Sequence, residues 1–349
     1  MRSRIAGIEA ARGVAALAVV TFHWWVFHDR GLEWADAAGY GWLGVQLFFA
    51  ISGFVLFLPY ARGDKRLDLP SFTAGRFLRI VPAWWAAVLI GGIVTGTAWT
   101  WANAGELVLL QMWWEPATDP VPQGWTLCAE AGFYVVMPII VVAVARYRPL
   151  QLPILLALVP LAWVALMELY HGFGIFTPLT WLDQFAWGMV AASVVARGIR
   201  VPGWVAMLAS AGGVWMMADV PRHVESPYGW PSANVAAAAF AVIVAWLATS
   251  RFTVPRVAIW LGTVSYGVYL WHFPLLALVA GGWLWALPDP VELILVLLGS
   301  VALGWMSWRL IEQPALRARP RLTAWVRRLG GRERPKVVDS PPLAEAQTY

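Results

Sequence analysis

The sequence predicts an all-helical integral membrane protein, built as a bundle of about ten transmembrane helices. Hydrophobic residues make up 60% of the 349 residues and charged residues only 13%, whereas soluble domains carry about 45–50% and about 25%. The apolar residues form long continuous runs, unlike the short alternating segments of a membrane β-barrel. This composition excludes a soluble enzyme, a disordered protein and a β-barrel. The single cysteine, Cys128, excludes a disulfide framework and a cysteine-based zinc site, and no metal is expected.

Ten runs come close to the roughly 20 mostly apolar residues that a helix needs to cross a bilayer. They cover residues 8–27, 43–60, 81–98, 125–145, 151–170, 175–196, 203–219, 233–249, 257–280 and 291–310. The first run is not a signal peptide, because Glu9 and Arg12 interrupt it and no clear cleavage site follows. The stretch from Leu107 to Trp114 is too short to span and is interpreted as an interfacial or re-entrant piece.

The basic residues predict that both termini lie in the cytoplasm. With the N-terminus inside, 23 of the 25 Lys and Arg residues fall on the cytoplasmic side, and only Arg30 and Arg222 fall outside. An odd number of spans would scramble this pattern, so the charges favour ten. Residues 1–314 are expected to form one transmembrane domain. Residues 315–349 are rich in Arg and Pro and are expected to form a disordered cytoplasmic tail.

Ionisable residues within these runs are candidates for function, because they are costly in a bilayer. Arg12 and His23 are 11 positions apart in the first run. They therefore face the same side of a helix, about 16 Å apart along its axis. Thr126, Glu130 and Tyr134 form a polar stripe in the fourth run. The plainer alternatives are a snorkelling arginine, an interfacial histidine and a structural ion pair.

Further polar positions lie in the second run and before the third. Ser52 and Gly53 sit among large apolar residues, where close helix packing through small residues is the plainer interpretation. Arg76 and Arg79 share a helix face at the cytoplasmic surface, just before Pro82, which restricts where the third helix can begin. They could clamp a phosphorylated ligand, since guanidinium groups match phosphate oxygens. Ordinary positive-inside charge is the alternative.

The ninth run carries a third polar face, formed by Ser265, Tyr269 and His272. His272 precedes Pro274, where a freed backbone carbonyl needs another partner, so a structural histidine is the plainer interpretation. Glu312 is the only carboxylate among many arginines at the end of the tenth run, which predicts a local ion pair. From these residues alone, a transporter and an enzyme fit about equally well.

Six blocks of these residues follow one another along the chain. They are Arg12 and His23 with ten residues between them, then 48–54, 76–82, 125–134, 265–272 and 312–314. In this order they resemble the acyltransferase family 3 membrane proteins. Thr126 stands where the family usually has serine, which keeps the hydroxyl. The resemblance implies a bacterial enzyme that acylates sugars, with acyl-CoA (most often acetyl-CoA) as the donor substrate and no permanently bound cofactor.

The resemblance also implies roles for individual residues. His23 is expected to be the general base, because an imidazole has an unperturbed pKa of about 6.5, with Glu130 as its orienting partner. Tyr269 and His272 could donate to the developing oxyanion. The residues expected to bind acyl-CoA are Arg12, Arg76 and Arg79, and the supporting residues are Ser52, Trp125, Thr126, Tyr134 and Ser265.

The implied partners are a carbohydrate or glycolipid acceptor and the lipid bilayer, with no nucleic acid. The implied location is the bacterial inner membrane, crossed many times. One alternative is a proton-coupled transporter or flippase that uses His23, Glu130 and His272 as a relay. The absence of an internal repeat counts against many transporter folds. Another alternative is a non-catalytic membrane scaffold, which would not need polar stripes on three separate helices.

Overall fold

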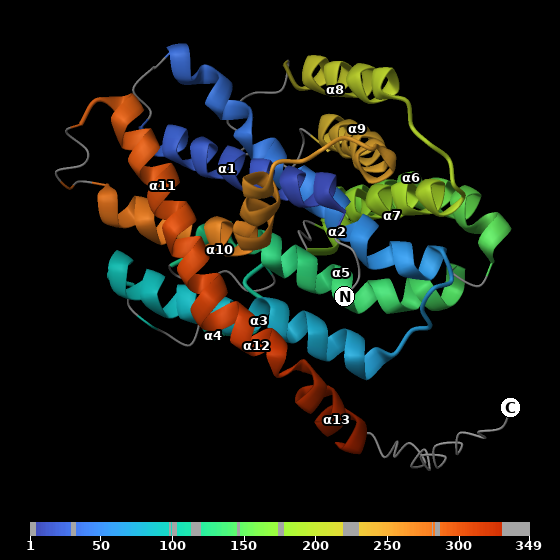
Figure 1. Ribbon diagram of the computed structural model, residues 1–349. Coiled ribbons are helices and arrows are strands. Elements are labelled where there is room, and N and C mark those ends of the chain that lie inside the picture. The colour runs from blue at the N-terminus through green and yellow to red at the C-terminus, as the bar shows by residue number, and fades with distance from the viewer. Residues whose placement is uncertain are drawn as a thin grey trace, which may run out of the picture.

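The computed structural model describes residues 5–28, 33–97, 99, 103–112, 120–144, 147–173, 178–218, 230–280, 282 and 287–329. Within these ranges the chain forms helices and no strands (Figure 1). The long helices are α1 (Ala6–His28), α2 (Leu43–Ala61), α3 (Leu69–Thr95), α5 (Trp125–Val144), α6 (Gln151–Phe173), α7 (Leu182–Ala196), α8 (Gly203–Ala218), α9 (Trp230–Thr249), α10 (Arg256–Val279) and α11 (Asp289–Ser307). The shorter ones are α4 (Ala104–Leu107), α12 (Gln313–Arg317) and α13 (Arg319–Leu329), and a π-helix (Trp308–Glu312) joins α11 to α12.

Six helices in the described ranges are long and apolar enough to cross a membrane. They are Ala6–Phe27, Ala37–Ala61, Leu69–Thr95, Pro122–Val144, Arg256–Val279 and Asp289–Arg317. Shorter apolar helices span Arg148–Val164, Leu182–Ala196 and Asn234–Thr249. The predicted all-helical fold is therefore confirmed for the described residues, its six long apolar helices are consistent with a membrane protein, and each of the ten predicted runs overlaps one long helix. A count of ten crossings and the cytoplasmic placement of both termini stay predictions, and Arg30 and Arg222 lie outside the described residues.

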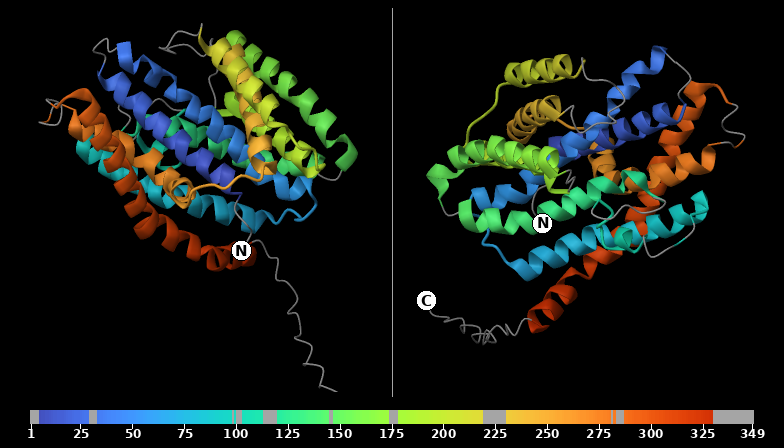
Figure 2. Two further views of the ribbon diagram at one scale, coloured as in Figure 1. Left: turned by 45° about the horizontal axis from the view of Figure 1, so that its top comes forward. Right: turned by 180° about the vertical axis from the view of Figure 1, so that it is seen from behind.

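The long helices pack in two groups (Figures 1 and 2). Helices α1, α3, α10 and α11 form one group, and α2 and α6 to α9 form the other, in which α2 contacts α7 and α9, α6 contacts α7, and α8 contacts α9. Contacts between α1 and α2, and of α5 with both α2 and α3, join the two groups. Helices α2 and α7 approach backbone to backbone: a Cβ on Gly53 would lie 2.0 Å from Phe185 O, and one on Gly188 would lie 2.0 Å from Ala50 O. This is the close packing through small residues that the sequence of the second run indicated.

Several connections predicted to share the cytoplasmic side meet at one end of the bundle. Arg148, before α6, donates a hydrogen bond to Arg62 O, after α2. Arg197, after α7, donates to Arg148 O over 2.9 Å. The beginning of α1 and the end of α9 line a cavity at this same end. We call it the arginine-rich end, defined by Arg62, Arg76, Arg148, Arg197 and Arg319, and we call the other the opposite end.

Helix α3 begins earlier than the sequence predicts. It starts at Leu69 instead of residue 81, and Pro82 lies inside it. The prediction treated Pro82 as the place where the helix begins, because the residue before a proline disfavours helical backbone angles. A proline inside a membrane helix is tolerated where neighbouring groups satisfy the freed carbonyl. Arg76 and Arg79 therefore belong to α3 itself.

The tail is helical where it was expected to be disordered. Helix α13 packs against α3, and Arg327 forms an ion pair with Asp68 there. Arg319 Nη2 donates to both Ser71 O and Ser71 Oγ, at 3.0 and 3.1 Å. Residues 319–329 differ from this expectation because the acceptors that hold this polar helix, on Asp68 and Ser71, lie far away in the sequence. Residues 330–349 lie outside the described residues.

The predicted interfacial piece, Leu107 to Trp114, is fastened to α3 at its first residue. Trp84 Nε1 donates to Glu106 O over 2.6 Å, and Trp85 Nε1 donates to Leu107 O over 2.7 Å. These bonds hold α4 and the turn after it against α3. Residues 113–119 of this connection lie outside the described ranges.

Candidate active site

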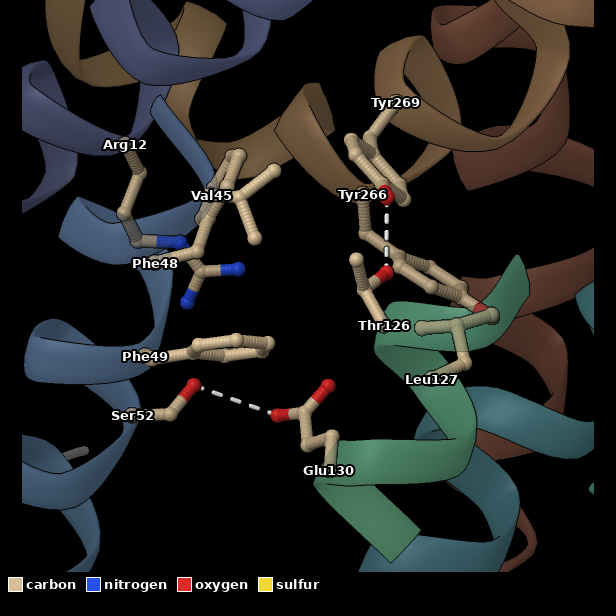
Figure 3. A pocket seen from close by; sticks show the side chains of 10 residues that line it. All are labelled: Arg12, Val45, Phe48, Phe49, Ser52, Thr126, Leu127, Glu130, Tyr266 and Tyr269. Carbon is tan, nitrogen blue, oxygen red and sulfur yellow. Dashed lines mark hydrogen bonds between the residues drawn. The ribbon is translucent and has the colours of Figure 1, made fainter. Parts of the chain in front are cut away.

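Four helices enclose a small cavity inside the bundle. Its volume is about 60 Å³, enough for a few water molecules. The ten lining residues come from α1, α2, α5 and α10 (Figure 3): Arg12, Val45, Phe48, Phe49, Ser52, Thr126, Leu127, Glu130, Tyr266 and Tyr269. Five of the residues expected in the site from the sequence therefore line one cavity. We call it the central cavity.

Arg12 is the only cation among the described residues that line the central cavity. Its guanidinium extends from α1 into the cavity, beside Phe48 and Phe49 and facing the side where Glu130 and Thr126 lie (Figure 3). Its Nε is buried and has no hydrogen-bond partner among the described residues. A buried donor without a partner is costly, so this side chain suits a ligand that brings an oxygen. It points into the bundle and does not snorkel to the membrane surface.

Glu130 is held by two hydroxyl groups. Ser52 Oγ donates to Glu130 Oε1 over 3.1 Å, and Tyr134 OH donates to the same oxygen over 2.5 Å. The Arg76 guanidinium carbon lies 5.6 Å from the centroid of the Tyr134 ring. The expected pairing of Glu130 with His23 is not the arrangement in the structure. Glu130 is instead bonded to its neighbour one turn along α5 and to α2.

Two hydroxyl groups lie together on the cavity wall. Thr126 Oγ1 and Tyr269 OH are 2.6 Å apart, and both lie within hydrogen-bond distance of Gln123 O, at 3.0 and 2.9 Å. Only two hydroxyl hydrogens are available for these three contacts. One hydroxyl can therefore turn its hydrogen toward a ligand while the other keeps its hydrogen bond. The sequence analysis did not single out Gln123, whose backbone carbonyl gives no sequence signal.

His23 and His272 form a pair behind Tyr269, toward the opposite end. His272 Nε2 lies 3.1 Å from His23 Nδ1, and the ring centroids are 4.9 Å apart. Each Nδ1 also faces a backbone carbonyl: His272 Nδ1 lies 2.5 Å from Tyr269 O, and His23 Nδ1 lies 3.0 Å from Val19 O. Carbonyls only accept, so we assign the hydrogen of each neutral ring to Nδ1. His272 Nε2 then accepts from His23, and His23 Nε2 keeps a lone pair.

This tautomer assignment changes the expected role of His272. Both of its ring nitrogens are engaged, so it has no hydrogen to offer to an oxyanion. His272 instead orients His23 so that His23 Nε2 is the nitrogen left free to act as a base. The sequence analysis gave this orienting role to Glu130. The rings of Tyr269 and His272 lie 5.7 Å apart, so the pair adjoins the central cavity although neither histidine lines it.

Arg76 and Arg79 point to different partners and do not form the expected clamp. Arg79 Nη1 lies 3.0 Å from Glu312 Oε2, whose side chain is fully buried. The ion pair predicted for Glu312 is thus confirmed, and the charge of Arg79 is neutralised. Arg76 lines a second cavity at the arginine-rich end, with Lys65 and Arg319. The sequence analysis counted Lys65 and Arg319 only as membrane-orienting charge.

Trp125 and Ser265, two of the predicted supporting residues, are not in the lining of the central cavity. Trp125 packs against Trp181, with ring centroids 4.9 Å apart. Ser265 Oγ donates to Gly262 O of its own helix over 2.9 Å. Tyr266, which the sequence analysis gave no role, lines the cavity and donates from its hydroxyl to Ile80 O over 2.9 Å.

Residues 5–309 match the family model described as an acyltransferase domain. The chain belongs to the acyltransferase family 3. This acyltransferase is 28% identical to the exopolysaccharide production protein ExoZ of Rhizobium meliloti, over 79% of this chain and 90% of ExoZ. It is 29% identical to nodulation protein 10 of Rhizobium leguminosarum, over 80% of this chain and 84% of that protein. It is 23% identical to the peptidoglycan O-acetyltransferase OatA of Listeria monocytogenes, over 90% of this chain and 56% of OatA.

No solved structure matches this acyltransferase. The resemblance predicted from the six sequence blocks is confirmed by the family match, and the protein is an enzyme that transfers acyl groups. Family membership favours this activity over the transporter alternative. The matched residues include all four helices around the central cavity, whereas α12 and α13 lie beyond them.

Proposed function

We propose that this acyltransferase moves an acyl group, most simply acetyl, from acyl-CoA to a hydroxyl of a carbohydrate or glycoconjugate at the bacterial inner membrane. Two relatives support the acceptor class by their names, one as an exopolysaccharide production protein and one as a peptidoglycan O-acetyltransferase. The donor is supported by the arrangement of cavities and charges in the bundle.

The observation that carries this proposal is the succession of cavities along α2. Two cavities at the arginine-rich end share Val55 and Pro59. The central cavity follows along the same helix, from Ser52 to Val45. At 1.5 Å per residue, Pro59 and Val45 are about 21 Å apart along α2. Cavities in this order suit a donor with a charged head and a thin flexible arm, which is the shape of acyl-CoA.

The proposed reaction needs only groups that the site supplies. The acceptor oxygen attacks the thioester carbonyl carbon and gives its proton to His23 Nε2. A carbon–oxygen bond forms and the carbon–sulfur bond breaks. The proton then passes from His23 to the leaving thiolate, which gives an ester and the free thiol of CoA. Arg12 and the Thr126–Tyr269 hydroxyl pair offer hydrogens to the developing oxyanion.

His23→Ala tests this proposal, with Thr21→Ala as the matched control. Thr21 lies on the same helix, and its hydroxyl bonds only to Leu17 O among the described residues. General-base loss typically costs about 10²–10⁴ in rate. We expect His23→Ala to lose acceptor-dependent release of CoA thiol to this extent, at normal expression, while Thr21→Ala keeps it. Near-normal turnover of His23→Ala would remove His23 from the mechanism.

The acceptor class is tested in cells. Mass spectrometry of surface glycans and lipid-linked sugars, with and without this gene, should reveal species that differ by one acetyl group. The same difference should disappear when only His23→Ala is supplied. If no glycan differs and the purified protein releases no thiol from acetyl-CoA with any glycan fraction, the proposed reaction is wrong.

A further inference from the structure

We propose that Gln123 is a positioning residue, whose side chain attaches the turn before α5 to α10 and so holds the hydroxyl groups of Thr126 and Tyr269 where the acyl group would react. This inference rests on the proposed acyl transfer, in which those hydroxyls offer hydrogens to the developing oxyanion. Gln123 belongs to the short turn Pro122–Gly124. It is not among the described residues that line the central cavity, so it would act through the hydroxyl pair.

The side chain of Gln123 bonds to a carbonyl that a proline leaves free. Pro274 lies inside α10 and has no N–H, so the carbonyl four residues earlier, Leu270 O, loses its usual helical donor. Gln123 Nε2 donates to Leu270 O over 3.1 Å. The sequence analysis indicated that a carbonyl freed by Pro274 needs another partner, and Gln123 is that partner. The proline site of α10 is thereby joined to the turn before α5.

The amide of Gln123 can be oriented in only one way. Leu270 O can only accept, so the nitrogen of the amide must face it. Gln123 Oε1 is then left buried, with no hydrogen-bond partner among the described residues. A buried acceptor without a partner is costly. A leucine of similar size would avoid this cost, so the bond to α10 is the feature that favours glutamine at this position.

The backbone of the same residue contacts both hydroxyl groups. Gln123 O lies 3.0 Å from Thr126 Oγ1 and 2.9 Å from Tyr269 OH. The two hydroxyl oxygens are 2.6 Å apart, as the dashed line in Figure 3 marks. Thr126 belongs to α5 and Tyr269 to α10, so this geometry depends on how the two helices are joined. A shift of the turn against α10 would move Gln123 O and Thr126 away from Tyr269.

Other contacts hold the turn against different parts of the bundle. Gln111, after α4, donates from Nε2 to Gly124 O over 2.9 Å. Gly124 also packs closely on α3, because a Cβ there would lie 2.2 Å from the Trp84 ring. These contacts do not involve α10. Removing the side-chain amide of Gln123 should therefore loosen the turn from α10 without releasing it from the bundle.

Gln123→Leu removes the amide at similar volume, and Gln184→Leu is the matched control. Both glutamines are 2% exposed, but Gln184 lies on α7 and is not among the described residues that line the central cavity. The assay is acceptor-dependent thiol release by the purified full-length protein in nanodiscs, with acetyl-CoA and the surface-glycan fraction that gains acetyl groups in cells.

We expect kcat to fall in Gln123→Leu only. Deleting an oxyanion donor outright typically costs about 10²–10³ in kcat, and misplacing one should cost less, so the expected loss is roughly 10–100-fold. The KM for acetyl-CoA should not change, because the head of the donor is expected at the arginine-rich end. Gln184→Leu should keep both constants.

Two double variants separate positioning from a merely structural role. Pro274→Ala supplies the missing N–H to Leu270 O, so it should restore the unfolding temperature that Gln123→Leu lowers. It does not reattach the turn, so Gln123→Leu should lower kcat by the same factor in the Pro274→Ala background. In the Tyr269→Phe background Gln123→Leu should cost less than in the wild type, because the hydroxyl that it positions is absent.

A folded Gln123→Leu protein that keeps kcat within about twofold of the wild type would overturn the inference. An unchanged kcat on adding Gln123→Leu to Pro274→Ala would do the same, as would equal losses with and without the Tyr269 hydroxyl. If Gln123→Leu alone does not fold, the comparison in the Pro274→Ala background gives the answer. A wild-type protein that releases no thiol from acetyl-CoA with any glycan fraction would instead refute the proposed acyl transfer, and the unfolding temperatures would still test the bond from Gln123 to Leu270.

Discussion

Replacing His272 tests His23 as the base without changing the base itself. His272 Nε2 accepts the His23 Nδ1–H over 3.1 Å, and Val19 O shares the same hydrogen at 3.0 Å. When His23 takes a proton, this becomes a hydrogen bond from a cation, a class that contributes about 1.5–3 kcal/mol. Because Val19 O remains as a second acceptor, we expect the lower part of that range. This corresponds to a loss of roughly 10–50-fold in kcat.

The assay is acceptor-dependent thiol release by His272→Leu and His272→Gln. Leucine removes the acceptor, whereas glutamine places an oxygen near the position of Nε2, so the glutamine variant should recover part of the rate. The KM for acetyl-CoA should not change in either variant, because the nucleotide is expected at the arginine-rich end. His272 is fully buried, so unfolding temperatures are compared first. A leucine variant that folds and keeps kcat within about twofold would refute the orienting role.

Three further predictions concern the bundle. Arg79→Ala leaves the buried Glu312 unpaired and should lower the free energy of unfolding by about 3–5 kcal/mol, whereas Arg79→Leu with Glu312→Leu should restore most of it, as measured by unfolding in detergent. Gly188→Val places a side chain 2.0 Å from Ala50 O and should lower the unfolding temperature, since overpacking costs about 1–3 kcal/mol or more. A reporter that is active only in the cytoplasm, fused after Tyr349, should be active, and activity of a periplasmic reporter there would contradict the predicted topology.

Features that depend on one helix could be predicted from the sequence. The period of the α-helix fixes which residues share a face, so the stripe of Thr126, Glu130 and Tyr134 follows from spacing alone. The cost of charge in a bilayer then requires that such a face turn inward. Arg12 and Glu130 do line one cavity, as this reasoning requires.

Features that depend on two helices could not be predicted in the same way. His23 and His272 are 249 positions apart, and no local pattern shows that their faces meet. The family resemblance led us to expect Glu130 as the orienting partner of His23. Tyr134, one turn along α5, and Ser52 on α2 occupy that carboxylate instead. Packing between helices therefore decided the hydrogen bonds of both groups.

Arg76 and Arg79 show how small an angle separates two roles. Residues three apart on a helix differ in direction by about 60°, as 3.6 residues per turn requires. On a free surface that counts as one face, and the sequence therefore predicted a single clamp. In the bundle it is enough to aim one guanidinium at the ring of Tyr134 and the other at Glu312. The cation that joins Arg76 is Arg319, from a helix that the sequence did not predict.

The distribution of charge explains how the two substrates could approach from different ends. Cations gather at the arginine-rich end, one cation and one carboxylate line the central cavity, and an imidazole pair lies toward the opposite end. A central cavity of about 60 Å³ admits a thin arm but excludes a nucleotide, so the charged head of the proposed donor must stay where the cations are. In the proposed reaction, an uncharged acceptor hydroxyl has no such attraction and needs only a base with a free lone pair, for which His23 Nε2 is the candidate. On this proposal, electrostatics orients the donor, and acceptor choice is left to the shape of the opposite end.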